Sequence, residues 1–278
     1  KRHREAKPRR GHRRLLRTAT EKGCRGEGLK DGEMNSFGIT DRGKVRRDNQ
    51  DSFLVERIEG RDALIAVLCD GMGGEKAGNI ASDLAAKTYA GVLRQRFAGQ
   101  KLKGAEVPEA MAAACAEANH MVYSYSCFDS AYTGMGTTLV SAVMLDGRAY
   151  VLNVGDSRAY KITRRKITQI TRDHSLVQDM VDRGEISAEE ARTHPRRNVI
   201  TRALGVDEDV PSDSFAPRLA RGDILLFCSD GLTNMLTDKE IFLAAKEHRD
   251  PLSLSRALMK AALERGARDN VTIIALTK

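Results

Sequence analysis

The sequence lacks long apolar runs and paired cysteines, and both absences limit where the protein works. No stretch of the 278 residues approaches the ~20 consecutive apolar residues of a membrane-spanning helix. The basic N-terminus is followed by no apolar segment, so we expect no signal peptide. The five cysteines contain no C-x-x-C pair, and their odd number provides no disulfide framework. We therefore expect a cytoplasmic protein in a reducing compartment, with no insertion into a membrane.

Residues with the spacing of zinc ligands or the setting of a reactive thiol are also missing. No group of His and Cys residues has the spacing of a zinc site. Cys69 and Cys228 lie inside apolar runs, where a thiol stays protonated and inert. The chemistry of this chain must therefore rest on other side chains.

Positive charge is concentrated at the N-terminus. The chain has a net charge of +8, and residues 1–33 contain 12 Lys/Arg and 5 Asp/Glu, a net of +7. This segment has few large apolar residues, so we expect a disordered tail. An arm that binds nucleic acid or an anionic surface is an alternative. Since the chain begins at Lys1 and Met34 stands where the ordered pattern begins, a third interpretation is an upstream extension outside the working protein.

The remaining sequence, 34–278, has the periodic patterns of one α+β domain. Strands are predicted at 36–40, 51–58, 63–70, 137–145, 148–155, 157–163, 223–230 and 270–278, and helices at 75–97, 105–126, 238–247 and 251–265. The polar segment 173–205 has only short helical pieces and is expected to leave the core. Because strands cluster and helices come in pairs, the pattern favours α+β over a regular βαβ alternation.

Aspartates recur at the ends of the apolar strands. A single Asp-Gly in such a place is typical of a turn, but this chain repeats the arrangement at Asp48, Asp51, Asp70, Asp156, Asp230 and Asp269. If the strand ends converge, the carboxylates repel one another and raise one another's pKa values, and a divalent cation relieves that repulsion. Oxygen ligands favour Mg²⁺ or Mn²⁺. Gly71, directly after Asp70, would let its carbonyl approach such an ion closely.

An acidic site with two or more divalent ions is suited to hydrolysing a phosphate ester. Such a site also needs a cation that holds the phosphate without being an ion ligand. Arg46 and Arg47 directly precede the DNQD segment that contains Asp51. Arginine binds phosphate through two parallel hydrogen bonds, so both are candidates.

Six short motifs follow one another along the chain in an order that resembles a known family. They are G-x-x-R-R-D-N-Q-D-S (43–52), D-G-M-G-G (70–74), G-M-G-T-T (134–138), G-D-S-R (155–158), S-D-G-L (229–232) and R-D-N-x-T (268–272). Together they resemble the metal-dependent protein phosphatases of type 2C, and the bacterial serine/threonine branch in particular. The resemblance covers about 35–278. It implies a four-layer αββα sandwich, with two antiparallel sheets flanked by helix pairs and a metal cleft at one end.

The resemblance also implies roles for single residues. Asp70 would bridge two Mn²⁺ or Mg²⁺ ions, with the Gly71 carbonyl on one of them. Asp230 and Asp269 would complete the ligand set of the first ion, and Asp51 would be a ligand of the second ion. Arg46 matches the arginine that holds the substrate phosphate, which leaves Arg47 as a solvated neighbour.

Bacterial members of the family often bind a third ion, and the motifs imply ligands for it here too. Asp156 and Asp230 match these ligands, with Asn198 as a weaker candidate. The polar segment 173–205 matches the mobile flap beside the cleft, where we expect substrate side chains to be recognised.

One position departs from the pattern of many eukaryotic members. Those members have a histidine, thought to be the proton donor, where this chain has Met72. Bacterial members commonly show the same change, so activity is still expected. The proton donor is left unassigned, with a metal-bound water preferred and His194 the histidine to test. A structural role is the alternative for His194 and for His174.

The sequence thus predicts hydrolysis of phosphoserine and phosphothreonine in proteins by direct attack of an activated water. No cysteine is followed by the x5-Arg loop of a cysteine-dependent phosphatase. Two alternatives remain open: a phosphate-binding pseudophosphatase, and a nucleic-acid-tethered protein that acts through its basic tail. By resemblance, the expected partners are phosphorylated protein substrates and a cognate Ser/Thr kinase. A monomer is the default expectation.

Overall fold

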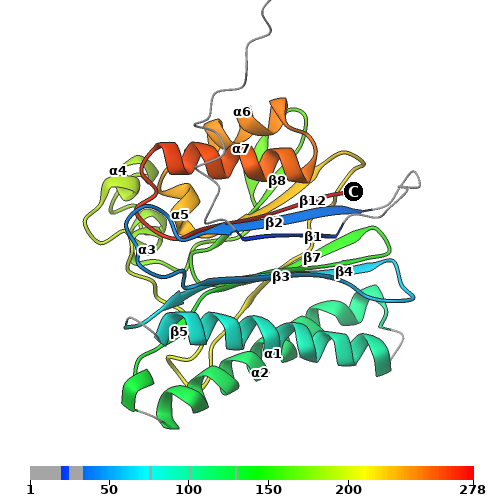
Figure 1. Ribbon diagram of the computed structural model, residues 1–278, viewed down its shortest axis with the longest axis horizontal. Helices are drawn as coiled ribbons and strands as arrows, with labels where there is room; N and C mark the ends of the chain where they lie inside the picture. The colour runs from blue at the N-terminus through cyan, green and yellow to red at the C-terminus, as the bar shows by residue number, and fades with distance from the viewer. Residues whose placement is uncertain (1–19, 25–33, 75–76, 100–101, 129) are drawn as a thin grey trace, which may run out of the picture.

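The fold is a four-layer sandwich, seen in a computed structural model that describes residues 20–24, 34–74, 77–99, 102–128 and 130–278. One outer layer contains helices α6 (Asp238–Glu247) and α7 (Pro251–Glu264), and the other contains α1 (Ala77–Gly99) and α2 (Val107–Phe128). Two sheets lie between these helix pairs (Figure 1). The αββα prediction is therefore confirmed. Among the described helices, none combines the length and apolar character that crossing a membrane requires.

The first sheet packs against α6 and α7. Its order is β1-β2-β12-β11-β8-β9, and every neighbouring pair is antiparallel. Its strands are β1 (Thr20–Cys24), β2 (Asn35–Asp41), β12 (Val271–Thr277), β11 (Ile224–Cys228), β8 (Arg158–Ile162) and β9 (Ile167–Gln169).

The second sheet packs against α1 and α2. Its order is β10-β7-β6-β4-β3, again antiparallel throughout, and a short strand β5 pairs with the end of β4. Its strands are β10 (Asp213–Phe215), β7 (Arg148–Val154), β6 (Leu139–Leu145), β4 (Ala63–Met72), β3 (Asp51–Arg57) and β5 (Gly136–Thr137).

Residues 63–69 of strand β4 are apolar at every position, and the structure shows why. Successive side chains in a strand point to opposite faces. Ile65 and Val67 belong to the core between the second sheet and α1/α2, whereas Leu64 and Leu68 belong to the core between the two sheets. Both faces of β4 are covered, so the strand does not alternate between apolar and polar residues.

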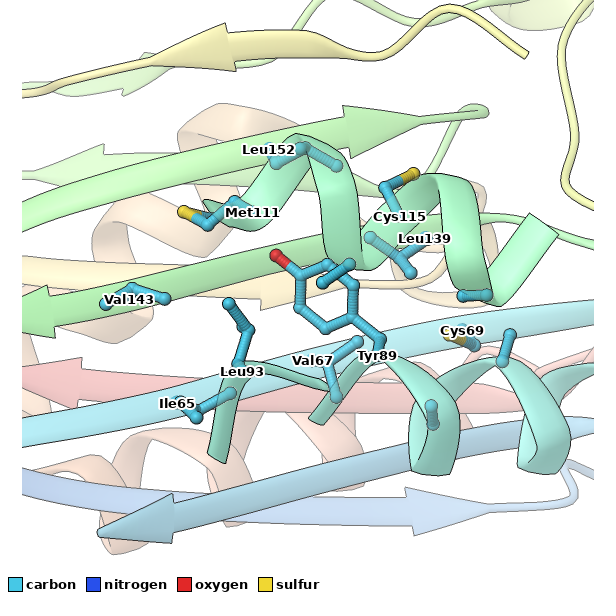
Figure 2. Packing of buried hydrophobic residues seen from close by; sticks show 14 of the residues in the cluster. Ile65, Val67, Cys69, Tyr89, Leu93, Met111, Cys115, Leu139, Val143 and Leu152 are labelled. Carbon is cyan, nitrogen blue, oxygen red and sulfur yellow. The ribbon is translucent and has the colours of Figure 1, made fainter. Parts of the chain in front are cut away.

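The core under α1 and α2 is organised around an aromatic side chain. Figure 2 shows the Tyr89 ring in the middle of this cluster, near Val67 and Leu93. Its hydroxyl forms a 2.7 Å hydrogen bond with Ser141 Oγ of β6, so the one polar atom of this buried ring is satisfied. A third apolar cluster lies between the first sheet and α5–α7.

Two expectations from the sequence need correction. Residues 20–24 form strand β1, paired with β2 from Thr20↔Thr40 to Cys24↔Ser36, so the expected disorder of 1–33 is wrong for these five residues. The rest of that segment lies outside the described residues. The predicted strand at 223–230 ends at Cys228, and α5 (Asp230–Thr233) follows it.

The segment 173–205 contains two short helices, as its pattern predicts. They are α3 (Leu176–Asp182) and α4 (Ala188–Thr193), and Ser175 and Ser187 cap their first turns. Isolated bridges Ser175↔Ile200 and Thr137↔Leu204 close the base of the segment. Figure 1 shows α3, α4, α5 and β5 at the same end of the sandwich.

Candidate active site

The strand-end aspartates come from both sheets. In the second sheet, Asp51 opens β3 and lies opposite Asp70 in the β3–β4 register. In the first sheet, Asp230 begins α5 directly after β11, and Asp269 precedes β12, the neighbour of β11. Asp156 follows β7 at the G-D-S turn. The elements therefore bring residues that are up to 218 positions apart in sequence to one end of the sandwich.

The pKa values show that these carboxylates interact. Burial, followed by the charges of Asp51, Asp230, Asp156 and Asp269, raises the pKa of Asp70 well above its ordinary value. The charge of every other aspartate in the predicted ligand set thus raises the pKa of Asp70. The repulsion predicted from the sequence is present.

The neighbouring carboxylates show the same effect. Burial raises the pKa of Asp51 to about 7, against two hydroxyl hydrogen bonds that lower it. Burial and the charge of Asp269 raise the pKa of Asp230 to about 6. Burial and the charge of Asp230 also raise the pKa of Asp156 well above its ordinary value. Without a counter-cation, this site favours partial protonation.

Asp51 has one carboxylate oxygen in use and one without a partner. Its Oδ2 accepts hydrogen bonds from Ser229 Oγ at 2.9 Å and from Thr272 Oγ1 at 2.6 Å. Its Oδ1 is buried and has no hydrogen-bond partner. An unpaired buried carboxylate oxygen is costly, and a cation is the partner that it lacks.

The G-M-G-T-T motif fixes the backbone of Asp70. The Asp70 amide donates to Thr138 Oγ1 at 3.0 Å, and the Asp70 carbonyl accepts from the Thr138 amide and the Thr137 hydroxyl, both at 2.9 Å. Thr138 Oγ1 also forms a 2.9 Å hydrogen bond with Ser157 Oγ, next to Asp156. The motif therefore links the Asp70 strand to the G-D-S turn.

Gly71 is required by close backbone packing. Its amide donates to the Gln50 carbonyl at 3.1 Å. A Cβ atom at this position would lie 2.0 Å from the Gly78 carbonyl oxygen of α1 and 2.6 Å from the Gln50 carbonyl oxygen. Only glycine fits where the start of α1 and the loop before β3 meet β4.

Arg46 lies at the acidic cluster. Its Nη2 contacts Asp269 Oδ2 at 2.8 Å, and its side chain is 53% exposed. The hydrogen bond to Asp269 is the largest effect that raises the pKa of Arg46, and the charges of Asp230 and Asp70 add to it. Asp48 is exposed, and it is not among the leading causes of the raised pKa values of Asp51 and Asp70. For Arg47, the structure shows the carbonyl accepting from Arg42 Nη1.

Asn270 is a site residue to which no role was assigned from the sequence. Its Oδ1 accepts from the Gln50 amide at 2.8 Å, and its Nδ2 donates to the carbonyls of Arg42 and Asp48, each at 2.9 Å. One amide side chain thereby shapes the loop that contains Arg46. Its place in R-D-N-x-T was the available signal.

The three residues named as candidate ligands of a third ion do not all lie at the same place. Asp156 and Asp230 both line a cavity of about 440 Å³ beside α3 and α4. Asn198 is exposed in the turn after α4 and is absent from that lining. The structure therefore brings Asp156 to Asp230 and leaves Asn198 outside the cavity.

The two histidines named as candidates have structural partners. His174 is buried, with Nδ1 accepting from the Gly155 amide at 3.0 Å and Nε2 lying 3.2 Å from Asp213 Oδ2. Burial is the largest cause lowering the pKa of His174. His194 caps the C-terminus of α4 and accepts from the Arg196 amide at 3.1 Å. These contacts favour the structural alternative for both.

The donor set fits a hard divalent cation. Among the described residues, no three His, Cys, Asp or Glu side chains already surround one point as metal ligands. The repulsion among the carboxylates and the Arg46–Asp269 ion pair both oppose such a tight arrangement without an ion. The unpartnered Asp51 Oδ1 and the all-oxygen character of the cluster match the preferences of Mg²⁺ and Mn²⁺.

Known proteins share this sequence and fold. The profile of the protein phosphatase 2C family matches residues 42–265. The serine/threonine phosphatase stp of Listeria monocytogenes is 37% identical over 236 residues, which is 84% of this chain and 92% of that protein. Stp1 of Staphylococcus aureus, a serine/threonine phosphatase, superposes with a TM-score of 0.82 at 36% identity, covering 92% of this chain and 99% of that one.

A further solved structure holds metal ions. It is the catalytic domain of the serine/threonine protein phosphatase PstP in complex with two manganese ions. It superposes with a TM-score of 0.75 at 31% identity and covers 88% of this chain and 97% of that one. Together with the family profile and the carboxylate cluster, these likenesses lead to one conclusion: the chain belongs to the protein phosphatase 2C family.

Proposed function

We propose that this chain is a metal-dependent protein serine/threonine phosphatase that hydrolyses phosphoserine and phosphothreonine in proteins. The observation that carries the proposal is the cluster of interacting carboxylates around Asp70, with an unpartnered buried oxygen on Asp51. The relatives are serine/threonine phosphatases, and the likeness to them spans most of both chains. The same intact cluster argues against a phosphate-binding pseudophosphatase.

Two divalent ions, Mn²⁺ or Mg²⁺, are proposed at this cluster. Asp70 and the Gly71 carbonyl would hold them together with Asp51, Asp230 and Asp269. When bound, such ions supply an activated water nucleophile and neutralise charge on the phosphoryl oxygens. The two manganese ions in the PstP structure support a count of two ions at this cluster.

A third ion is proposed at Asp156 and Asp230. These two carboxylates interact, and both line the cavity beside the flap. Asn198 has no part in this proposal because it lies off the cavity lining.

Arg46 is proposed to hold the substrate phosphate. Only its Nη2 is engaged with Asp269, and the half-exposed guanidinium has further N–H groups to donate. Charge-assisted hydrogen bonds from arginine to phosphate fix both position and orientation. The ion pair with Asp269 would keep this donor beside the ions.

The nucleophile is proposed to be water, without a phosphoenzyme. Burial raises the pKa values of Cys69 and Cys228, so both thiols stay protonated. Met72 has no proton to give, and His174 and His194 have structural hydrogen bonds. Water in the cleft therefore remains the proposed proton donor to the leaving serine or threonine oxygen.

The test is phosphate release from phosphoserine and phosphothreonine peptides. We expect turnover with Mn²⁺ or Mg²⁺, none with EDTA, and a loss of at least about 10³-fold in Asp70→Asn. Asp48→Asn removes an exposed carboxylate that lies outside the cluster, and it is expected to keep full activity. Undiminished turnover in EDTA or in Asp70→Asn would show that the site assignment is wrong.

The cellular setting is proposed from the same activity. The partners would be phosphorylated proteins in the cytoplasm, together with the Ser/Thr kinase that phosphorylates them. Salt-dependent RNA binding that disappears when residues 1–33 are deleted would instead support the nucleic-acid alternative.

A further inference from the structure

A cavity lies between the flap and the body of the protein. It has a volume of about 440 Å³ and is walled by α3 and α4 on one side and by α5 and the start of α6 on the other. Asp156 and Asp230 line it as well, so it is continuous with the proposed ion site. A peptide whose phosphoresidue occupies that site would have its neighbouring residues within reach of the cavity.

Three cationic side chains of this cavity have no carboxylate partner among the described residues: Arg192, Arg197 and Lys239. Arg192 Nη2 donates to the Thr233 carbonyl at 3.2 Å, across the gap between α4 and α5. Arg197 and Lys239 are exposed, and within the described part of the chain their side chains form no hydrogen bond or ion pair. These two cations are free to bind a ligand.

The acidic groups of the cavity outside the ion site are already engaged. Asp173 is paired with Arg158, with Nη2–Oδ2 at 2.6 Å and Nε–Oδ1 at 3.0 Å. Asp238 accepts a hydrogen bond from the Tyr160 hydroxyl at 3.0 Å. Lys239 also lies in the first turn of α6, where the helix dipole adds positive potential. Within the described residues, the positive charge that has no carboxylate partner in this cavity therefore lies at Arg192, Arg197 and Lys239.

The flap wall adds an apolar lining. Val177 and Val181 of α3 and Ala188 and Ala191 of α4 face the cavity. This surface suits the methylene groups of a side chain, while the cations suit its charged end.

We propose that this cavity binds a second anionic group of the substrate, either an acidic side chain or a second phosphate near the phosphoresidue. The proposal rests on the phosphatase function proposed above. Arg197 and Lys239 are its specificity-determining residues. An anion at this place would form charge-assisted hydrogen bonds with them.

The experiment compares phosphoserine peptides that differ at the flanking positions. One set has Asp or Glu there, one has phosphoserine, and a neutral set has Asn, Gln or Ser. We expect the wild-type kcat/KM to be about tenfold higher for the anionic sets than for the neutral set, chiefly through KM. If Asp or Glu raises kcat/KM as much as phosphoserine does, a carboxylate is the ligand. If only phosphoserine raises kcat/KM, the ligand is a phosphate.

The double variant Arg197→Glu/Lys239→Glu is expected to abolish or reverse this preference, because it replaces the two free cations by anions. Arg196→Glu is the matched control, since Arg196 is an exposed neighbour that does not line the cavity, and the preference should persist in it. Melting temperatures of all variants verify folding.

A wild-type protein with no preference, or a double variant with the wild-type preference, would overturn the proposal. Failure of the phosphatase function is a different result. It would appear as no ion-dependent phosphate release by the wild type from any peptide, the neutral set included.

Discussion

Asp51 is held in a state that costs folding free energy. Two hydroxyl groups stabilise its Oδ2, but its Oδ1 is buried without a partner, and burial raises the pKa from 3.8 to about 7. A raised carboxyl pKa in the folded state means that the folded protein binds a proton more tightly than the unfolded chain does. The ionised form of Asp51 therefore destabilises the ion-free protein.

The first prediction concerns Asp51→Asn in EDTA. The stabilising protonated form of Asp51 is present below about pH 4 and is lost as the pH rises through about 7. The wild type should therefore lose stability relative to the variant across this window. Urea unfolding at a series of pH values should give similar stabilities near pH 4, and a variant more stable by about 2–4 kcal/mol above pH 7. A wild type that is the more stable protein above pH 7 contradicts the prediction.

The sequence predicts the carboxylates of the site but not the residues that orient them. Asp70 and Asp230 stand out because each ends an apolar run. Asn270 and Thr138 show no such local sign, because they act through hydrogen bonds to backbone far away in the chain, for example between Asn270 and Gln50. Such partners become apparent only when the fold brings the segments together.

At the scale of elements, the junction of β4 and α1 controls the site. The chain leaves Asp70 through Gly71 and turns into α1, and the carbonyl of Gly78 in the first turns of α1 lies against Gly71. The loop before β3 reaches the same place through the Gln50 carbonyl. Three segments thus meet where there is no room for a side chain.

The second prediction compares two glycines of this junction. Gly71→Ala should reduce the free energy of unfolding by about 3 kcal/mol, because its Cβ would overlap two carbonyl oxygens. Gly74→Ala is the matched control, since nothing lies within 4 Å of a Cβ at that position. Denaturant unfolding measures both, and equal effects of the two substitutions would argue against the packing explanation.

The third prediction concerns the base of the flap. His174 accepts from the buried Gly155 amide, one residue before Asp156, and its other ring nitrogen faces Asp213. Asp213 in turn accepts from Arg202 at 3.1 Å, at the far end of the flap segment. His174→Leu leaves a buried N–H unpaired and should cost about 2 kcal/mol in urea unfolding.

The control for this substitution is His120→Leu. His120 is exposed on α2, so the change should stay within about 0.5 kcal/mol of the wild type. A loss of stability no larger in His174→Leu than in this control would mean that the Gly155 hydrogen bond contributes nothing.

The long elements and the short helices α3 and α4 were predictable from the sequence, and the shortest elements were not. The four long helices and the main strands have enough residues to show a period. Strand β5 has two residues, strand β10 has three, and α5 has four, so no period develops in them. Their existence depends on neighbours supplied by the tertiary structure, such as β7 for β10.

At the scale of the whole molecule, the site lies across the junction of the two sheets. Asp51 and Asp70 come from the second sheet, whereas Asp230 and Asp269 flank strands of the first. A cation bound among them would connect the two sheets in addition to the apolar core between them. Ion binding and global stability should therefore be coupled.

The fourth prediction follows from this coupling. Because an ion that binds only the folded state stabilises it by mass action, Mn²⁺ at about 100 times its Kd should add about 2.7 kcal/mol. For a chain of this size, the melting temperature should rise by about 5–10 °C. Differential scanning calorimetry should show this rise in the wild type and in Asp48→Asn, and much less of it in Asp70→Asn. A similar rise in all three proteins would place the ion elsewhere.

Strand order is the part of the fold that sequence patterns alone leave open. Nothing local in residues 271–277 indicates that they pair with residues 35–41 on one side and 224–228 on the other. The likeness of the motifs to a known family implied two antiparallel sheets, and no strand order was predicted from it. Long-range pairing of this kind is decided by the whole set of buried surfaces.

The central place of β12 has a consequence for how the protein is made. A ribosome produces β2, β8 and β11 well before β12, yet β12 separates β2 from β11 in the finished sheet. Strands β2 and β11 must each keep one edge unpaired until residues 271–277 emerge, and Asp269 and Asn270 arrive only just ahead of them. Nascent chains that lack these residues should therefore be catalytically silent and expose two strand edges, so their need for chaperones should fall once β12 is made.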